Sequence, residues 1–211
     1  EAACTCGSDA VRFEPTAGDG GDDWSGEVLE GARTCREAGV HFAWMWPRVA
    51  PPPFVRKELD RLPDLFVRGV PGIMAGEMGL AEAIRARVPE MEVLGGAGLN
   101  IVNSEAALFL HPPIDRFTLS PEIPRADIPV LISRAVTKCP GLSFEVICQG
   151  TIEAMVSRNR LLTDLLGEHG PGHYGLKDET GRVFPVYEDR LGRTRILNAV
   201  ETTLIDHVPF L

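Results

Sequence analysis

The chain has 211 residues, a mass of 23.0 kDa and 44% hydrophobic residues, which suits one domain with a sizeable core, or one domain with a small appendage. Its formal charge of -9 and its pI near 5.1 argue against a broad, non-specific grip on nucleic acid or an anionic membrane, because the long-range field repels polyanions. A local basic groove remains compatible with this charge.

No apolar run approaches the roughly 20 residues that span a bilayer, and residues 1–7 lack the basic start and apolar stretch of a signal peptide. We therefore expect a cytoplasmic protein without a membrane partner. The chain begins at Glu1 rather than at Met, which suggests a processed product or an excised fragment. Five cysteines, an odd number, do not make a disulfide framework and favour a reducing compartment. Cys4 and Cys6 have no second cysteine pair that would complete four ligands, so no metal site is predicted.

Short apolar runs alternate with helical patterns between residues 10 and 150, which is typical of repeated βα units and a parallel sheet. The predicted strands are Ala10 to Phe13, His41 to Trp46, Ile73 to Ala75, Met91 to Leu94, Arg116 to Ser120 and Phe144 to Cys148. The predicted helices run from an N-cap at Ser25 to Gly39, from Phe54 to Phe66, from Leu80 to Val88, from a cap at Ser104 to Leu110, and from Ile128 to Lys138. An exposed loop is expected from Gly18 to Asp23.

Six such repeats fit a parallel barrel better than an open sheet, but about eight strands close a barrel. We therefore predict an α/β fold in which residues 1–150 form a parallel (β/α) barrel-like domain that is incomplete at its N-terminus. After Gly150 the sequence becomes rich in Gly, His and Arg and predicts β-hairpins. Their strands are Tyr174 to Lys177, Val183 to Val186 and Arg195 to Leu197. Residues 151–211 are expected to complete or cap the barrel. His169 and His173 are separated by Gly-Pro-Gly, which excludes a helical zinc pair.

Polar residues at the predicted strand ends are the candidates for function, because the carboxyl ends of parallel strands form the working face of such folds. Side-chain amides are scarce in this chain, and four of its five amide residues stand at or just after predicted strand ends. The five are Asn100, Asn103, Gln149, Asn159 and Asn198. Other side chains near strand ends are Arg12, Glu14, His41, Trp44, Trp46 and Glu77. The amide scarcity also suits a thermophile, although high genomic GC content would explain the accompanying excess of arginine.

Two further candidates carry charge or a hydroxyl. Glu122 follows Ser-Pro at a strand exit, where a carboxylate could act as a general base or hold a substrate amine, and a solvated carboxylate at a helix start explains it equally well. Ser157 and Arg158 precede a second arginine, Arg160, in a stretch that would suit an anionic substrate group. An ordinary exposed basic turn accounts for this stretch about as well.

Several segments together resemble the collagenase-like peptidases, family 32 of the peptidases of unknown catalytic mechanism. The matching stretches are Gly7 to Val11, Leu99 to Ser104, Leu119 to Ile123, Phe144 to Gly150, Met155 to Arg158, Leu176 to Gly181, Phe184 to Val186 and Ile196 to Asn198. The resemblance implies a barrel-like α/β core and a chain that starts after the family's first strand. It also implies peptidase activity, or else hydroxylation of RNA or quinone precursors by members that hold an iron–sulfur cluster on four cysteines.

The chain departs from the cluster-binding pattern. Arg160 stands where the family has a cysteine, and residues 161–174 contain none. Thiolates are the ligands of such clusters, so no iron–sulfur cofactor is expected.

We therefore predict a peptidase of undetermined mechanism that acts on a peptide or similar polar substrate. Glu122 and Ser157 are its predicted catalytic residues, and Asn100, Asn103, Gln149 and Arg158 its predicted substrate-binding residues. One alternative is an RNA-modification factor in which Arg158, Arg160, Arg193 and Arg195 form a local phosphate-binding patch. A second alternative is a non-catalytic binding subunit.

Overall fold

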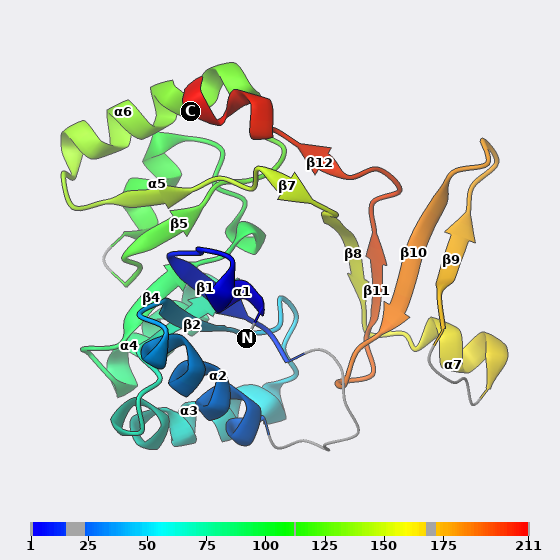
Figure 1. Cartoon of the computed structure of the whole chain (residues 1–211), viewed down its shortest axis with the longest axis horizontal. Coiled ribbons are helices and arrows are strands. Elements are labelled where there is room, and N and C mark those ends of the chain that lie inside the picture. The colour runs from blue at the N-terminus through cyan, green and yellow to red at the C-terminus, as the bar shows by residue number, and fades with distance from the viewer. Residues whose placement is uncertain (1, 16–23, 112, 168–171, 211) are drawn as a thin grey trace. The chain divides into compact units, whose positions relative to one another are not determined.

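The computed structural model describes residues 2–15, 24–111, 113–167 and 172–210 and divides them into two compact units (Figure 1). Unit 1 ends at Val146, and unit 2 comprises residues 147–210. The predicted loop from Gly18 to Asp23 and His169 lie outside the described residues.

Unit 1 is built on a six-stranded sheet in which every strand is parallel to its neighbours. In sheet order the strands are β1 (Ala10–Phe13), β2 (His41–Met45), β3 (Gly72–Ala75), β4 (Glu92–Gly95), β5 (Arg116–Thr118) and β6 (Ser143–Glu145). The sheet curls into a half-barrel, which confirms the predicted α/β barrel-like fold. Three strands, β2, β5 and β6, end earlier than the sequence predicted. The predicted strand to Ser120, for example, ends at Thr118 and continues only as a single bridge between Ile101 and Leu119.

Helices alternate with these strands, as the sequence pattern predicts. They are α1 (Ala2–Thr5), α2 (Ser25–Glu37), α3 (Pro52–Val67), α4 (Met78–Arg87), α5 (Ser104–Leu110) and α6 (Ile128–Lys138), with short 3₁₀ helices at Ala97–Leu99 and Arg125–Asp127. Two predicted caps are wrong by one residue. Trp24 precedes α2, and Asn103 caps α5 by accepting the backbone N–H of Ala106 at 2.8 Å.

One face of the sheet packs against helices and forms most of the core. Val28, Ala32 and Cys35 give α2 a buried stripe, and the α2 residue Gly31 lies against the ring of Phe42 on β2. Figure 1 shows α2, α3 and α4 along this side of the strands.

An aromatic chain extends this core beyond the sheet. The ring centroids of Trp44 and Trp46 are 5.3 Å apart, and those of Trp46 and Phe54 are 5.6 Å apart. Both tryptophans are almost fully buried, so they are packing residues rather than side chains of a site.

The opposite, inner face of the sheet is lined by small and flexible apolar residues near its centre. Ala43, Met74 and Leu94 form a buried cluster, with Met45 packed against it. Polar side chains of the outer strands flank this cluster and are described with the candidate site.

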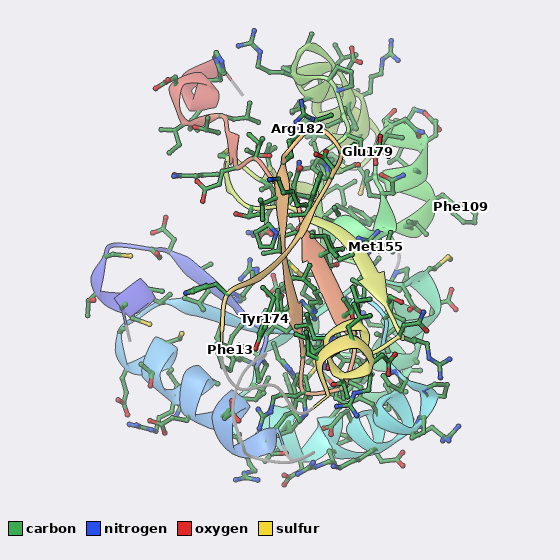
Figure 2. All side chains as sticks on the ribbon, turned by 90° about the vertical axis from the view of Figure 1, so that its right-hand side faces the viewer. Phe13, Phe109, Met155, Tyr174, Glu179 and Arg182 are labelled. Carbon is green, nitrogen blue, oxygen red and sulfur yellow. The ribbon has the colours of Figure 1, made fainter. Side chains whose placement is uncertain are left out.

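Unit 2 is antiparallel. Four strands in the order β8 (Glu153–Ser157), β11 (Thr194–Leu197), β10 (Val183–Glu188) and β9 (Tyr174–Lys177) form one sheet, and β7 (Gln149–Gly150) pairs with β12 (Thr202–Thr203). The predicted hairpin strands are present, whereas β8 and the helix α7 (Leu161–Leu166) were not predicted. Glu179 and Arg182 lie at the tip of the hairpin that joins β9 and β10 (Figure 2). A short 3₁₀ helix, Ile205–Phe210, follows β12.

Two aspartates organise the hairpin turns of unit 2 in the same way, one exposed and one buried. Asp178 accepts the backbone N–H groups of Thr180 and Arg182, both at 2.9 Å. Asp189 accepts the N–H of Leu191 at 3.0 Å and that of Arg193 at 3.1 Å.

The buried turn also carries charge. Arg193 forms an ion pair with Asp189, and Arg195 Nε donates to it at 3.0 Å. All three side chains are buried. Burial by itself would raise the pKa of Asp189, but the hydrogen bond and charge of Arg193, with the charge of Arg195, hold that pKa below its usual value.

The substitution Asp189→Asn should therefore destabilise unit 2 by about 3 kcal/mol, because two buried guanidiniums lose a carboxylate partner, while Arg195 keeps its ion pair with Glu153 at 3.4 Å. Both tyrosines, Tyr174 and Tyr187, lie in unit 2, so tyrosine absorbance during urea unfolding reports on this unit. Asp178→Asn, which alters the exposed turn, is the matched control and should cost clearly less. An unchanged tyrosine transition in Asp189→Asn would contradict this assignment.

The sign of the pH dependence follows from the lowered pKa. The charged form of Asp189 stabilises the fold above the usual aspartate pKa of about 3.9, and this stabilisation is lost as the pH falls through the folded-state pKa. The difference in unfolding free energy between the parent protein and Asp189→Asn should shrink accordingly below about pH 4.

Candidate functional site

A polar cluster forms where β4 and β5 end. Asn100 follows the 3₁₀ turn after β4 and has φ 53°, a left-handed conformation that asparagine tolerates better than most residues. Its Oδ1 accepts the hydroxyl proton of Ser120 at 2.6 Å, and the Ser120 oxygen accepts the backbone N–H of Glu122 at 3.2 Å. Ser120 is buried, whereas Asn100 and Glu122 are exposed. Asn100 and Glu122 were predicted from the sequence as separate candidates. Ser120, which was not predicted, links them by hydrogen bonds.

Asn103 lies three residues after Asn100 and stabilises the start of α5. Its side-chain oxygen caps α5, which leaves only its amide N–H groups for a ligand. A role in substrate binding stays a prediction for this residue.

The remaining predicted site residues belong to unit 2. Gln149 is exposed on β7 opposite Thr203, and Arg158 is exposed after β8. Ser157 Oγ accepts the backbone N–H of Asn159 at 3.1 Å. Within the described part of the chain no histidine or carboxylate is hydrogen-bonded to Ser157 Oγ, and a catalytic role for Ser157 stays a prediction.

The proposed four-arginine patch of unit 2 is wrong for two of its members. Arg193 is 2% exposed and Arg195 is 5% exposed, and both are bound to Asp189. Of the four arginines in this patch, Arg158 and Arg160 are exposed. A sequence cannot distinguish a guanidinium that faces solvent from one that a buried carboxylate neutralises.

A second polar cluster lies on the inner face of the unit 1 sheet and connects its two edge strands. Arg12 on β1 forms an ion pair with Glu145 on β6, with Nη2 and Oε1 2.6 Å apart. Arg116 on β5 places Nη1 3.5 Å from the same Glu145 oxygen and donates from Nε to Ser143 at 3.1 Å. Thr118 donates to the other Glu145 oxygen at 3.3 Å.

The cluster continues through His41 to Glu92. Arg12 Nη1 lies 3.3 Å from His41 Nδ1, and because a guanidinium can only donate, Nδ1 is the acceptor in a hydrogen bond between them. His41 Nε2 in turn lies 3.0 Å from Glu92 Oε2. Glu92 belongs to β4 and His41 to β2, so the contact passes over β3, where Gly72 pairs with Glu92 and has no side chain in the way.

This inner cluster was mostly missed from the sequence. Arg12 was named near a strand end, but His41 is the first residue of β2 and stands at the amino end. Arg116, Glu145 and Glu92 lie inside strands, and no local pattern marks them. The available signal was a charged residue within a short strand of a predicted barrel, where alternate side chains point inward.

The cysteines do not assemble a ligand set for a metal or cluster. Among the residues that the structure describes, no group of three or more His, Cys, Asp and Glu side chains could hold a metal ion. Cys4 and Cys35 are the two thiols that meet, with Sγ atoms 3.5 Å apart. Burial and the contact with Cys4 raise the pKa of Cys35 to about 11, which disfavours the thiolate that a cluster needs.

The comparisons with known proteins concern the fold. No protein-family model matches the chain, and no curated protein matches it. A solved structure described as that of the U32 peptidase Mk0906 is similar, with a TM-score of 0.50 and 18% sequence identity. The match covers 69% of this chain and 62% of that structure, so the chain spans less than two thirds of the solved protein.

The described residues include no helix that is long and apolar enough to cross a membrane.

The route from Glu92 to His41 can be tested at Gly72. A Cβ there would lie 3.1 Å from Glu92 Oε2 and 3.3 Å from the Glu92 backbone oxygen. Gly72→Ala should therefore displace Glu92 and destabilise unit 1 by about 1–3 kcal/mol. All three tryptophans lie in unit 1, so tryptophan fluorescence during urea unfolding measures the effect.

Gly79→Ala is the matched control, because Gly79 is exposed on α4 and a Cβ there meets nothing within 4 Å. It should be neutral or slightly stabilising, since alanine favours helix. Equal stability of the Gly72 and Gly79 variants would show that Glu92 has room to move.

Proposed function

We propose that this chain is a peptidase-like protein that binds a peptide along the carboxyl ends of the unit 1 strands. The observation that carries the proposal is the Asn100, Ser120 and Glu122 cluster, in which the Ser120 hydroxyl joins the Asn100 side chain to the backbone of Glu122 at two neighbouring strand ends. The similarity of the half-barrel to a structure described as a U32 peptidase supports the reaction class.

The proposed roles follow from which atoms of the cluster are already used. Ser120 occupies Oδ1 of Asn100, so the Asn100 amide N–H groups are the donors for a peptide carbonyl. Glu122 is exposed and is the proposed general base that activates a water molecule. Asn103 of unit 1 remains a proposed substrate contact, and the roles of Ser157, Gln149 and Arg158 in unit 2 stay predictions from the sequence.

An RNA-modification factor is less well supported, because two of the four arginines proposed to bind phosphate are buried against Asp189. A non-catalytic binding subunit is the other alternative. It differs from a peptidase in one outcome, which is binding without cleavage.

The proposal is tested with a mixture of fluorescein-labelled decapeptides, with binding followed by polarisation and cleavage by mass spectrometry. The parent protein should bind and cleave. Glu122→Gln should bind with similar affinity and lose about 10²–10⁴-fold in cleavage rate, the usual contribution of general-base catalysis. Asn100→Gly keeps the left-handed backbone without strain and should weaken binding about tenfold, by the loss of one hydrogen bond.

Glu90→Gln is the control for charge, because Glu90 is an exposed carboxylate of unit 1 that lies before β4. It should bind and cleave as the parent does. Cleavage by Glu122→Gln at the parental rate would remove Glu122 from catalysis. A parent protein that neither binds nor cleaves would contradict the proposal itself.

A further inference from the structure

The inner-face cluster of unit 1 carries an uneven charge. Two guanidiniums, Arg12 and Arg116, face one carboxylate, Glu145, so this end of the cluster is positive. The compensating carboxylate, Glu92, lies on the far side of His41, which is in contact with Arg12. Arg12, Arg116 and Glu145, on β1, β5 and β6, form the positive end of the cluster.

The positive end has donor capacity that the protein does not use. Arg12 Nε is buried and has no hydrogen-bond acceptor among the described residues. A buried donor of this kind is unfavourable while it stays unsatisfied. The side chain of Arg116 is 39% exposed, and its contacts with Ser143 and Glu145 use Nε and Nη1 and leave Nη2. An incoming acceptor can therefore reach Nη2 of Arg116, whose position Glu145 and Ser143 already fix.

This positive end adjoins the cluster at the strand ends. Thr118, which donates to Glu145, ends β5, and Ser120 follows two residues later. Leu119 between them is buried and donates its backbone N–H to the Glu145 carbonyl at 2.9 Å. Because side chains alternate along a strand, Thr118 and Ser120 share the inner side of the sheet. A ligand bound at Arg116 can thus extend toward Asn100 and Glu122.

We propose that Arg12 and Arg116 bind the α-carboxylate of a peptide, so that the site takes peptides by their free carboxyl end. This inference rests on the proposed function and names its substrate class. The chemistry is a charge-assisted hydrogen bond from Nη2 of Arg116 to the carboxylate, and the neighbouring charge of Arg12 adds to the attraction. Glu145 opposes an incoming anion, but it neutralises one guanidinium and leaves the second in excess.

The experiment compares N-acetylated peptides of one sequence by isothermal titration. One peptide has a free α-carboxylate, one has a carboxyl-terminal amide, and one has the amide with an internal glutamate. The free acid should bind at least tenfold more tightly than the amide, and the internal glutamate should not restore the difference. In Arg116→Gln the free acid should fall to the affinity of the amide.

Arg116 is varied rather than Arg12, because Arg12 links the edge strands and its loss endangers the fold. The matched control is Arg87→Gln. Arg87 is a partly exposed arginine of unit 1 that pairs with Asp60 at 2.7 Å on the helices. This variant should keep the preference for the free acid, and tryptophan fluorescence verifies that both variants fold.

The outcomes separate this inference from the function on which it rests. Equal binding of acid and amide by the parent, or an unchanged preference in Arg116→Gln, overturns the carboxylate site and leaves peptide binding intact. Recovery of tight binding by the internal glutamate overturns recognition of the peptide end. If none of the three peptides binds the parent protein, the proposed function fails and this inference fails with it.

Discussion

The ion pair between Arg12 and Glu145 is the contact on which the geometry of unit 1 depends. It joins β1 and β6, the two edge strands of the six-stranded sheet, which are not hydrogen-bonded to one another. A flat sheet of this size would hold its edges tens of ångströms apart, since neighbouring strands are about 4.8 Å apart. The pair can form only because the sheet curls and brings the inner sides of β1 and β6 toward each other. With side chains 16% and 27% exposed, it is partly desolvated, and loss of either partner would leave a poorly hydrated charge.

The inner face can hold these charges because two of its positions, Ala43 and Gly72, carry a small side chain or none. Ala43 and Gly72 leave space between the strands, and Glu92 uses that space to reach His41. Arg12 then lies between an imidazole and a carboxylate, with its orientation set from both sides. Preorganised guanidinium donors of this kind lose little entropy when an anion binds. The contacts that the curled sheet makes possible thus prepare its positive end for a ligand.

The sequence was sufficient to predict the βα order and the helices, because apolar runs and helical periodicity are local properties. Helix α6 was predicted from Ile128 to Lys138, as found, from its buried stripe. The strand ends were less accurate, since where a parallel strand stops depends on its neighbours: the predicted strand to Cys148 ends at Glu145. Pairing across the fold could not be predicted at all. Ser120 joining Asn100 to Glu122, and Asp189 removing Arg193 and Arg195 from the surface, are contacts between segments whose approach only the fold determines.

The central claim is that a peptide carboxylate binds on the inner face of unit 1 beside the strand-end cluster. Nuclear magnetic resonance of the side-chain N–H signals tests it most directly, during titration with the N-acetylated free-acid peptide. The account predicts that the signals of Arg12, Arg116 and the Asn100 amide move together with a single dissociation constant, while those of Arg193 and Arg195 stay in place. Movement confined to Arg158 and Arg160, with Arg12 and Arg116 unchanged, would contradict it.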